Sequence, residues 1–428
     1  MSGAGVLMRL APPPARVPPN PSPAVIIPEP SAREAAMAVS PPLDGRAASA
    51  DEVWAPTIVE RLRDWLADRI ATPGFQQWAA RFPLTAPLAR RRSRALFDVF
   101  AGFVYTQTVQ AAVRLGLFEL LAAEGPMQTA AIAARIGLPV EGAERLLKAA
   151  ASLQLIERRR PTWWALGQRA APLVNNVGLR ALVHHHAMVY RDLADPVALL
   201  RKTGSDHPPT EVRSFFPYGD VDRPQAFDGE TVTPYSQLMS DTLPPLAADI
   251  LDAYDLSRHE RLLDVGGGNG TFLSLALERH PRLGGLLFDL PAVTELADAN
   301  LRARGLRERV ALHGGNFHAD PIPTGADVIS LVRVCLDHDD ASVLRLLTRI
   351  HRALPKGGTL LIAEAMAGAK GAEPVGDAYF QFYLLAMGRG RARQPAELRE
   401  MLRKAGFRRS RVHRTPYPVQ TGLISAEA

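Results

Sequence analysis

The sequence contains a single cysteine, Cys335, among its 428 residues. A disulfide framework and a cysteine-rich metal site are therefore excluded. Long apolar runs are missing too, because no stretch approaches the roughly 20 uninterrupted apolar residues that a membrane-spanning helix needs. With 47% hydrophobic and 22% charged residues, the composition is that of a globular protein. A chain of this length is expected to divide into two or three domains.

Lysine is also scarce, because only five of the 50 basic residues are lysine and the rest are arginine. The formal net charge is +6 at pH 7. A modest positive excess indicates attraction to an anionic partner, such as lipid headgroups, nucleic acid or an acidic ligand. An arginine-biased proteome would give the same excess without any such partner, so charge alone leaves these alternatives open.

The first half of the chain changes texture near residue 50. Residues 1–50 hold 11 of the 36 prolines, interleaved with alanine and serine, which predicts a disordered tail. Apolar residues at helical spacing then predict helices over 54–70 and 75–82. A basic cluster from Arg90 to Arg94 leads directly into a predicted apolar helix over 95–116. The cluster fits either a solvated helix start or a contact with anionic headgroups.

Residues 117–165 have the pattern of a winged helix. Two short helices, over 130–136 and 140–153, are followed by a predicted hairpin. The second helix carries Glu141 and Glu144 at its N-terminal end, where DNA phosphates would be repelled. We therefore expect no nucleic acid partner.

Three consecutive histidines, at positions 184–186, are the only concentration of this residue type. Adjacent residues on a helix do not face one way, so they make a poor metal site. We expect a packed or exposed helix turn there and no metal. The stretch 203–232 is rich in proline, glycine and aspartate and is predicted to be a long loop.

The second half alternates short apolar runs with helical segments. The runs are RLLDVG, GLLFDL, VALHG, VISLVRV and GTLLIAEA. This βαβ alternation predicts an α/β domain, in which a parallel sheet has helices on both faces.

The strongest chemical signal is an acidic residue, Asp264, that leads a glycine-rich turn at the end of a predicted buried strand. The glycines at alternate positions are Gly266, Gly268 and Gly270. A dinucleotide fold wants G-x-G-x-x-G, but the sixth position counted from Gly266 is Thr271. A carboxylate beside the loop would repel a pyrophosphate, whereas it suits the cationic amino-acid end of S-adenosylmethionine. The pattern favours methyl transfer; a nicotinamide dinucleotide and a ligand-free turn are the alternatives.

Further residues fit one nucleoside pocket. Asp289 ends the next predicted strand, 19 positions after Gly270, where a carboxylate can hold both ribose hydroxyls. Asn316 is predicted to bond the adenine edge, and Phe317 to pack on its face. Leu290 and Arg333 are assigned to the same cofactor site.

The motifs VGGGNG, FDLP, GGNF, LDHDD, ALPKGG and AEAM, after a helix–turn–helix region, resemble plant and bacterial small-molecule O-methyltransferases. The resemblance covers roughly residues 95–428. The stretches FQQWAARFPL, ARRRSRALFD and FYLLAMGRGR are more similar to one branch, the purple-bacterial carotenoid O-methyltransferases. That branch methylates the tertiary hydroxyl of an acyclic hydroxycarotenoid in carotenoid biosynthesis.

The resemblance implies the fold and the assembly. It implies a class I methyltransferase Rossmann-like sheet, preceded by a mostly helical winged-helix-like dimerisation domain that forms a homodimer. The expected parts are the tail at 1–50, the dimerisation domain at 51–235 and the S-adenosylmethionine-dependent methyltransferase domain at 236–428. A cytoplasmic location is implied, with peripheral contact at the inner photosynthetic membrane, for which the Arg90–Arg94 cluster is the candidate.

The family's catalytic positions are incompletely retained. The family has a His-Asp pair in which the histidine is the general base, and alignment on Asp337 puts Leu336 at the histidine position. A glutamate that orients the base matches Glu364, and a second one falls at Ala392. Candidate proton acceptors are therefore His338, Asp337 and Glu364. We expect catalysis mainly by proximity and desolvation, with late proton removal.

The methyl acceptor implied by the resemblance is lipophilic. The candidate substrate residues are Tyr235, Met239, Phe382, Leu385 and Met387. Without the resemblance, such an aromatic and apolar stripe is more often core. Three other hypotheses stay open: a methyltransferase for a phenolic or polyketide metabolite, a winged-helix regulator, and a catalytically silent cofactor-binding scaffold.

Overall fold

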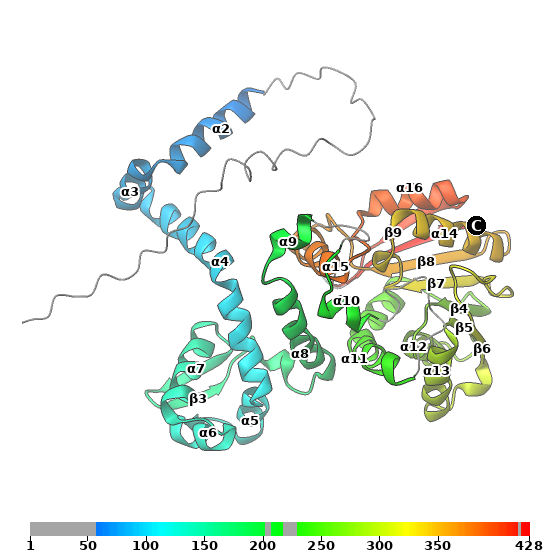
Figure 1. Ribbon diagram of the computed structural model, residues 1–428, viewed down its shortest axis with the longest axis horizontal. Helices are drawn as coiled ribbons and strands as arrows, with labels where there is room; N and C mark the ends of the chain where they lie inside the picture. The colour runs from blue at the N-terminus through cyan, green and yellow to red at the C-terminus, as the bar shows by residue number, and fades with distance from the viewer. Residues whose placement is uncertain (1–56, 202–206, 217–228, 418–420) are drawn as a thin grey trace, which may run out of the picture. The chain divides into compact units, whose positions relative to one another are not determined.

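The computed structural model describes residues 57–201, 207–216, 229–417 and 421–428 (Figure 1). The tail predicted at 1–50 lies outside the described residues. The chain divides into two compact units, residues 1–93 and 94–428.

The first unit contains α2 (Ile58–Ala71) and α3 (Pro73–Arg81). Thr57 caps α2 in a capping box with Glu60. None of the residues of α2 is buried, and most of its large apolar side chains, including Leu62 and Trp65, are solvent-exposed. The next helix, α4 (Ala86–Arg114), starts earlier than the expected residue 95, so the arginine cluster lies inside a helix rather than before one.

The predicted winged helix is present in the second unit. It comprises α5 (Leu117–Glu124), β1 (Met127–Gln128), α6 (Thr129–Ile136), α7 (Val140–Ser152), β2 (Ile156–Arg160) and β3 (Trp163–Leu166). The strands form an antiparallel sheet in the order β1-β3-β2. Buried Trp164 fixes the wing to α6, because its Nε1–H donates to Thr129 Oγ1 at 2.8 Å.

The charged face of α7 is internally paired. Arg145 bonds Glu141, and Lys148 bonds Glu144, each at 2.6 Å and one helical turn apart. The basic side chains that could have met a phosphate thus already have acidic partners.

Four helices connect the winged helix to the sheet. They are α8 (Val177–Asp192), α9 (Pro196–Arg201), α10 (Glu211–Phe215) and α11 (Gly229–Ala253), after a 3₁₀ turn, η1 (Ala171–Leu173). The stretch 203–232 was expected to be one loop, but it contains α10 and the start of α11, so the prediction of a continuous loop is wrong. The expected domain boundary at 235/236 falls within α11.

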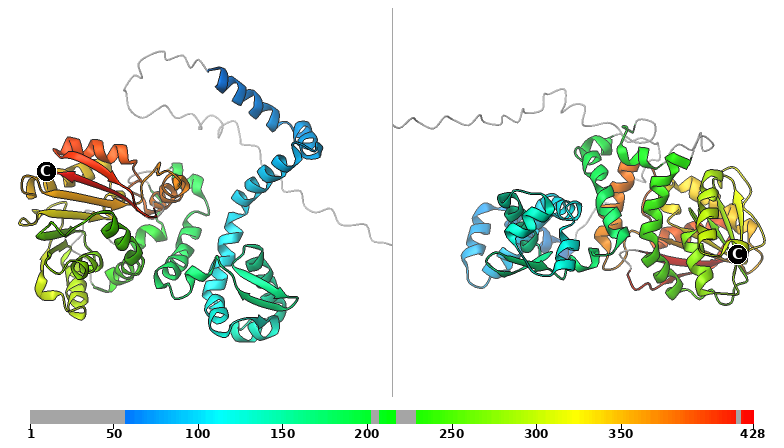
Figure 2. Two further views of the ribbon diagram at one scale, coloured as in Figure 1. Left: turned by 180° about the vertical axis from the view of Figure 1, so that it is seen from behind. Right: turned by 90° about the horizontal axis from the view of Figure 1, so that it is seen from below.

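A seven-stranded sheet forms the rest of the unit (Figures 1 and 2), with strand order β6-β5-β4-β7-β8-β10-β9. The strands are β4 (Arg261–Val265), β5 (Gly284–Asp289), β6 (Val310–Gly314), β7 (Val328–Val332), β8 (Thr359–Glu364), β9 (Arg408–His413) and β10 (Gly422–Glu427). The strands β4 to β8 pair in parallel, and β10 pairs antiparallel with both β8 and β9. The α/β prediction is confirmed.

Helices cover both faces of this sheet (Figure 2). They are α11, α12 (Thr271–Arg279), α13 (Pro291–Ala303), α14 (Asp340–Ala353) and α16 (Pro395–Ala405). The remaining elements are the short turns η5 (Arg307–Arg309) and η6 (Cys335–Asp337), a π-helix, η7 (Val375–Phe380), and α15 (Gln381–Met387), which packs against α8, α9 and α10. Alternate strand residues serve the two faces. Leu263 packs in the cluster with α14 and α16, whereas Leu262 packs in the cluster with α11, α12 and α13. Burial on both faces explains the near-continuous apolar runs in the sequence.

Candidate functional site

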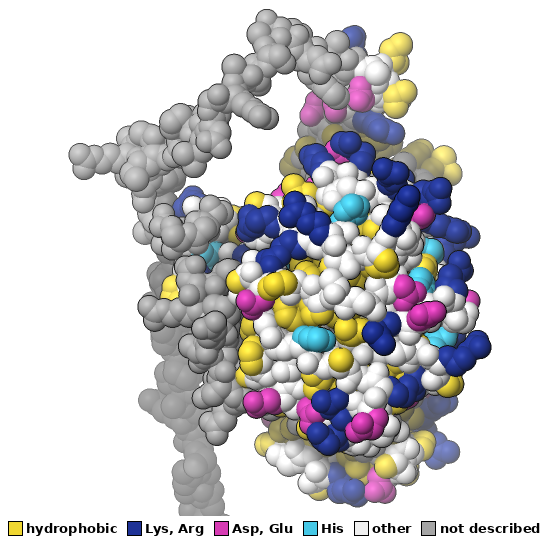
Figure 3. Space-filling model, turned by 90° about the vertical axis from the view of Figure 1, so that its right-hand side faces the viewer, with side chains coloured by type: hydrophobic (Ala, Val, Ile, Leu, Met, Phe, Trp, Pro, Cys, Tyr) yellow, Lys and Arg dark blue, Asp and Glu magenta, His cyan; other side chains and the backbone are white. Residues whose placement is uncertain are grey.

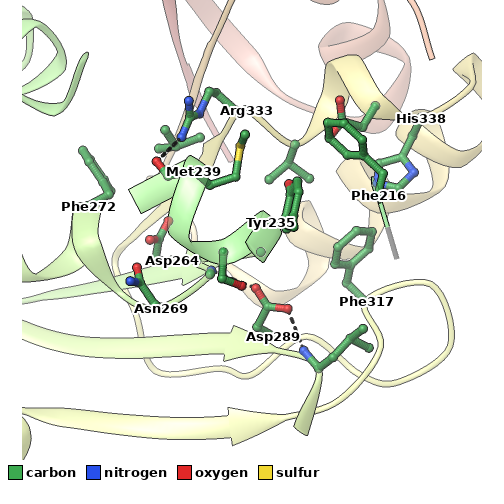
Figure 4. A pocket seen from close by; sticks show the side chains of 18 of the residues that line it. Phe216, Tyr235, Met239, Asp264, Asn269, Phe272, Asp289, Phe317, Arg333 and His338 are labelled. Carbon is green, nitrogen blue, oxygen red and sulfur yellow. Dashed lines mark hydrogen bonds between the residues drawn. The ribbon is translucent and has the colours of Figure 1, made fainter. Parts of the chain in front are cut away.

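The main cavity opens at the carboxyl ends of β4, β5 and β7 (Figure 4) and encloses about 1230 Å³, including its mouth. This edge of a parallel sheet, where the strand order reverses, is where open α/β folds bind ligands. Thirteen predicted site residues line it: Gly266, Gly268, Tyr235, Met239, Asp264, Asp289, Leu290, Asn316, Phe317, Arg333, Asp337, His338 and Met387.

The glycine-rich turn after β4 forms the floor of the cavity. Gly266, Gly268 and Gly270 all have positive φ, at +70°, +59° and +77°, which explains their spacing. A Cβ at Gly268 would meet no atom within 4 Å, so this backbone faces open space where a ligand can approach. Gly270 does not line the cavity; it begins α12 and packs near Leu287.

Asp264 is buried at the end of β4, with only 1% of its surface exposed. Its Oδ1 accepts a 2.6 Å hydrogen bond from Ser330 Oγ, but its Oδ2 has no partner among the described residues. Burial raises the pKa of this carboxyl to about 7. A buried carboxylate oxygen without a donor fits the ammonium group of an amino-acid ligand, so the site matches S-adenosylmethionine on this observation.

Asp289 connects two loops at the floor. Its Oδ2 accepts from the Gly268 N–H at 2.8 Å, and its Oδ1 accepts from the Leu290 N–H at 2.7 Å (Figure 4). Burial raises its pKa to about 6, although both hydrogen bonds oppose the shift. The carboxyl therefore holds the glycine turn in place while it lines the cavity, as a ribose-binding group should.

An aromatic group closes the far end. The rings of Phe317 and His338 meet edge to face at 5.4 Å, and His318 lies 4.8 Å from His338. Asn316 Oδ1 accepts from the His318 N–H at 2.9 Å, which fixes this turn after β6. The side chains predicted to contact adenine are thus brought together, with His338 as a third wall.

Arg333 ties the end of β7 to α11. Its Nη2–H donates to the Met239 carbonyl at 2.7 Å (Figure 4), and its Nη1–H donates to Thr242 Oγ1 at 2.9 Å. The residue has a φ of +56°, an uncommon value without glycine. Burial lowers its pKa, while Tyr235 and Asp337 oppose the shift. Its cationic head lines the cavity near the helix that carries Tyr235 and Met239.

The three proton-acceptor candidates occupy different environments. Asp337 lines the cavity, and burial raises its pKa to about 7 against the attraction of Arg333 and Arg389. His338 also lines the cavity, but burial lowers its pKa to about 3. Glu364 is fully buried, does not line the cavity, and accepts from the Leu336 N–H at 3.0 Å. Burial raises the pKa of Glu364 to about 8.

The wall for a methyl acceptor comes mostly from helices. Tyr235, Met239 and Leu243 follow one another at successive turns of α11, and Met387 ends α15. Two other predicted residues do not line the cavity: Phe382 is 37% exposed, and Leu385 contributes its carbonyl to a 2.6 Å bond with His207 Nε2. On α15, only the residue at its end reaches the site, because the rest of the short helix packs elsewhere.

Several lining residues were missed in the sequence. They are Phe216, Ser236, Ser240, Leu243, Gly267, Asn269, Phe272, Gly315, His318, Val332, Val334 and Arg389. Leu243 could have been found by extending the four-residue spacing of Tyr235 and Met239. Arg389 lies inside a stretch used for the family resemblance. No sequence signal marked Phe216, which follows a helix in a region predicted as loop.

The consecutive histidines pair with tyrosines. His185 Nε2 bonds the Tyr383 hydroxyl at 2.7 Å, and His186 Nε2 bonds the Tyr379 hydroxyl at 2.8 Å. Within the described ranges, no group of three or more His, Cys, Asp or Glu residues is placed to hold a metal ion. No helix among the described residues is long and apolar enough to cross a membrane.

Known proteins match both parts of the second unit. Residues 190–408 match the O-methyltransferase domain, and residues 97–176 match the O-methyltransferase dimerisation domain. Demethylspheroidene O-methyltransferase from Cereibacter sphaeroides is 42% identical over 82% of this chain and 91% of its own length. The protein of that name from Rhodobacter capsulatus is 43% identical, over 81% of this chain and 85% of its own length.

Solved structures agree in fold. Human N-acetylserotonin methyltransferase in complex with S-adenosylmethionine has a TM-score of 0.65 and is 25% identical, covering 78% of this chain and 97% of that one. Three findings point to the same family. Both domains match in order, two relatives are more than 40% identical, and the cavity fits the cofactor. The chain belongs to the S-adenosylmethionine-dependent O-methyltransferase family.

Proposed function

We propose that this enzyme transfers a methyl group from S-adenosylmethionine to the tertiary hydroxyl of an acyclic hydroxycarotenoid, in the spheroidene or spirilloxanthin branch of carotenoid biosynthesis. The observation that carries the substrate is the identity of 42% and 43% to two demethylspheroidene O-methyltransferases, over nearly their whole length. The apolar helical wall and the leucine at the family's base position support the same substrate.

Different residues would bind different parts of the cofactor. Asp264 would accept from the ammonium group, and Asp289 from the ribose hydroxyls, while Asn316, Phe317 and His338 would enclose the adenine. The guanidinium of Arg333 is the candidate partner for the amino-acid carboxylate, since an Arg side chain has more donors than the two used in its bonds to α11. The cofactor supplies a methyl group on a positively charged sulfur, which a neutral hydroxyl oxygen can attack.

Asp337 is the best-placed proton acceptor. It lines the cavity and has a pKa of about 7, so its carboxylate is available at neutral pH and can hold a proton. His338 holds a proton poorly, with a pKa of about 3, and Glu364 does not reach the cavity. A tertiary alcohol is a weak acid, so its proton leaves late, and the residues contribute mainly by alignment and exclusion of water.

Leu336 favours an alkanol over a phenol. It is 5% exposed and packs with Phe216, Tyr383 and Met387, two of which line the cavity. A phenol methyltransferase benefits from an imidazole base at this position. The chain has an apolar side chain there, which suits an apolar guest whose hydroxyl needs no early deprotonation.

We further propose a homodimer and a peripheral membrane contact. Residues 97–176 match a dimerisation domain, which supports the dimer. Arg90, Arg91 and Arg92 are exposed on α4, and exposed apolar side chains including Trp65 and Trp78 precede them in the first unit. Arginine with interfacial tryptophan suits an anionic membrane surface, where the lipophilic substrate resides.

Charge is spread on the sheet-bearing unit. Figure 3 shows Lys and Arg side chains scattered over one face, with Asp and Glu side chains between them.

Membrane binding by the arginine cluster is tested by sedimentation with vesicles of phosphatidylglycerol and phosphatidylcholine. Replacing Arg90, Arg91 and Arg92 by glutamine should abolish sedimentation with anionic vesicles; unchanged sedimentation would contradict the contact.

Incubation of the purified enzyme with methyl-labelled cofactor and a carotenoid extract from a methyltransferase-deficient phototroph tests the substrate. Label should appear in a methoxycarotenoid. A naphthoate methyltransferase of Streptomyces sahachiroi is 34% identical, so a hydroxynaphthoate is the matched competing substrate. Label in the naphthoate alone would replace the carotenoid proposal by the phenolic alternative.

A further inference from the structure

Glu364 and Arg393 are two buried ionisable side chains behind the loop that carries Asp337 and His338. Glu364 ends β8 and Arg393 precedes α16, and both side chains are 0% exposed. Neither lines the cavity, and attraction by Arg393 opposes the upward pKa shift of Glu364. These two buried ionisable groups lie beside the site but do not line its cavity. Their role is therefore something other than direct contact with a ligand.

Both side chains are bound to the backbone of the loop. Glu364 Oε2 accepts from the Leu336 N–H at 3.0 Å. Arg393 Nη1–H donates to the Cys335 carbonyl at 2.7 Å, and its Nη2–H donates to the His338 carbonyl at 2.6 Å. The same guanidinium meets Asp340, at the start of α14, through Nε–H at 2.9 Å. Bonds at these points fix the backbone on either side of Asp337.

The segment before Arg393 reinforces this arrangement. The Arg391 N–H donates to the Leu336 carbonyl at 3.0 Å. A Cβ at Gly390, which has a φ of +76°, would lie 2.2 Å from the Leu336 carbonyl oxygen, so the two backbones are in direct contact. Met387 and Arg389, which line the cavity, immediately precede this contact.

We infer that Glu364 and Arg393 are positioning residues, which hold the loop from Cys335 to His338 so that Asp337 faces the methyl acceptor. The pair also joins that loop to the chain segment that forms the acceptor wall. Glu364 acts as a hydrogen-bond acceptor for the backbone and takes no proton from the substrate. The inference rests on the proposed methyl transfer, so turnover by the unaltered enzyme is measured first.

Two substitutions of Glu364 separate positioning from proton removal. Glu364→Gln keeps a carbonyl oxygen for the Leu336 N–H, and at pH 7 the carboxyl of Glu364 is mostly neutral already, with a pKa of about 8. We expect kcat within about threefold of wild type, and loss of any kcat transition near pH 8. Glu364→Leu removes the acceptor and should lower kcat on the order of 100-fold, as misplacement of a reacting group does.

Arg393 has a matched control two residues away. Arg393→Met should lower kcat on the order of 100-fold, with Arg393→Lys intermediate because lysine lacks the planar fork. Arg391→Met also removes a guanidinium that pairs with Asp340, but its side chain makes no bond to the loop carbonyls, so kcat should stay near wild type. Binding of S-adenosylhomocysteine, measured by calorimetry, should weaken much less than kcat falls, since Asp264 and Asp289 lie on other strands and only His338 of the proposed cofactor residues lies on this loop.

The outcomes separate the alternatives. An inactive wild type would contradict the proposed function. The effect of Glu364 and Arg393 on the loop would then be judged from cofactor binding and from the unfolding temperature of the variants. Given an active wild type, loss of all activity in Glu364→Gln at every pH would identify Glu364 as a proton acceptor and overturn the inference. Equal kcat in Arg393→Met and Arg391→Met, with only a lower unfolding temperature for the former, would make Arg393 structural and also overturn it.

Discussion

The two sides of the cavity are built in different ways. The cofactor side comes from short loops at the ends of β4 and β5, close together in the sequence, and it presents two carboxyls whose pKa values are raised. The acceptor side is assembled from α11, the loop after β7 and the end of α15, and it is mostly apolar. In the proposed function, the first side recognises charge and hydrogen-bond donors, whereas the second recognises shape and excludes water.

The largest expected effect concerns the charge on the cofactor side. Asp264→Asn removes the buried carboxylate that is proposed to face the ammonium group, and loss of one partner of a buried charge pair should weaken S-adenosylhomocysteine binding on the order of 100-fold. Calorimetric titration measures the dissociation constant. Ser330→Ala, which removes only the hydroxyl bonded to Oδ1, is the control and should have a much smaller effect. Equal affinities for Asp264→Asn and wild type would show that this carboxylate does not bind the cofactor.

A second substitution tests what the acceptor side gains from being apolar. Leu336→His puts an imidazole among apolar neighbours, at a residue whose backbone N–H donates to Glu364. We expect the free energy of unfolding to fall by about 2 kcal/mol, as for a polar group buried with poor compensation. Urea unfolding measures this loss.

The same variant should gain rate with a phenol relative to a tertiary alkanol. The reason is that a neutral imidazole can take a proton from the more acidic phenol. Competition between a hydroxynaphthoate and the carotenoid in one assay measures the ratio. A ratio that stays at the wild-type value would show that Leu336 does not select between these acceptors.

How far the sequence predicts each side follows from this difference in construction. Asp264, Asp289 and the glycines were found because a tight turn and a carboxylate leave a local pattern. Met239 and Met387 depend on the packing of helices far apart in the chain, and the same apolar pattern in Phe382 and Leu385 faces elsewhere. A helix period identifies residues that share a face, but it does not say which element that face meets.

The fold shows the same difference between features with a local sequence pattern and features that depend on distant residues. Alternating short apolar runs predicted the parallel sheet, because burial on both faces leaves near-continuous apolar strands. The stretch 203–232 was predicted as a loop because of its prolines and glycines, yet Thr210 caps α10 by accepting from the Arg213 N–H, and Asp192 accepts from the N–H groups of Glu211 and Val212. Capping by a residue distant in sequence is invisible in local composition.

The third prediction is a dependence of cofactor binding on pH. Asp264 has its pKa raised to about 7 by burial, so below that pH the free protein holds a proton that the ammonium group must displace. Affinity for S-adenosylhomocysteine should therefore fall about tenfold from pH 8 to pH 6, with Asp289, at about 6, acting in the same direction. Calorimetry in buffers of different ionisation enthalpy should detect proton release on binding at pH 6.

The stability of the free protein has the opposite sign. Raised folded-state pKa values stabilise the protonated protein, so this contribution is full below about pH 4 and is lost as pH rises to about 7. The rise in unfolding temperature on adding S-adenosylhomocysteine should be larger at pH 8 than at pH 6. Asp264→Asn should flatten both dependences, and an unchanged pH dependence in that variant would assign the titration to another group.

The smallest predicted effect separates two residues of one helix. Met387 is 2% exposed and lines the cavity, so Met387→Ala should raise KM for the lipophilic acceptor about fivefold, through lost apolar contact. Phe382 is 37% exposed and away from the cavity, so Phe382→Ala should leave KM within about twofold of wild type. Steady-state rates on carotenoid in detergent micelles measure both. If instead Phe382→Ala had the larger effect, the acceptor would bind along the exposed face of α15, and Met387 would not belong to the acceptor wall.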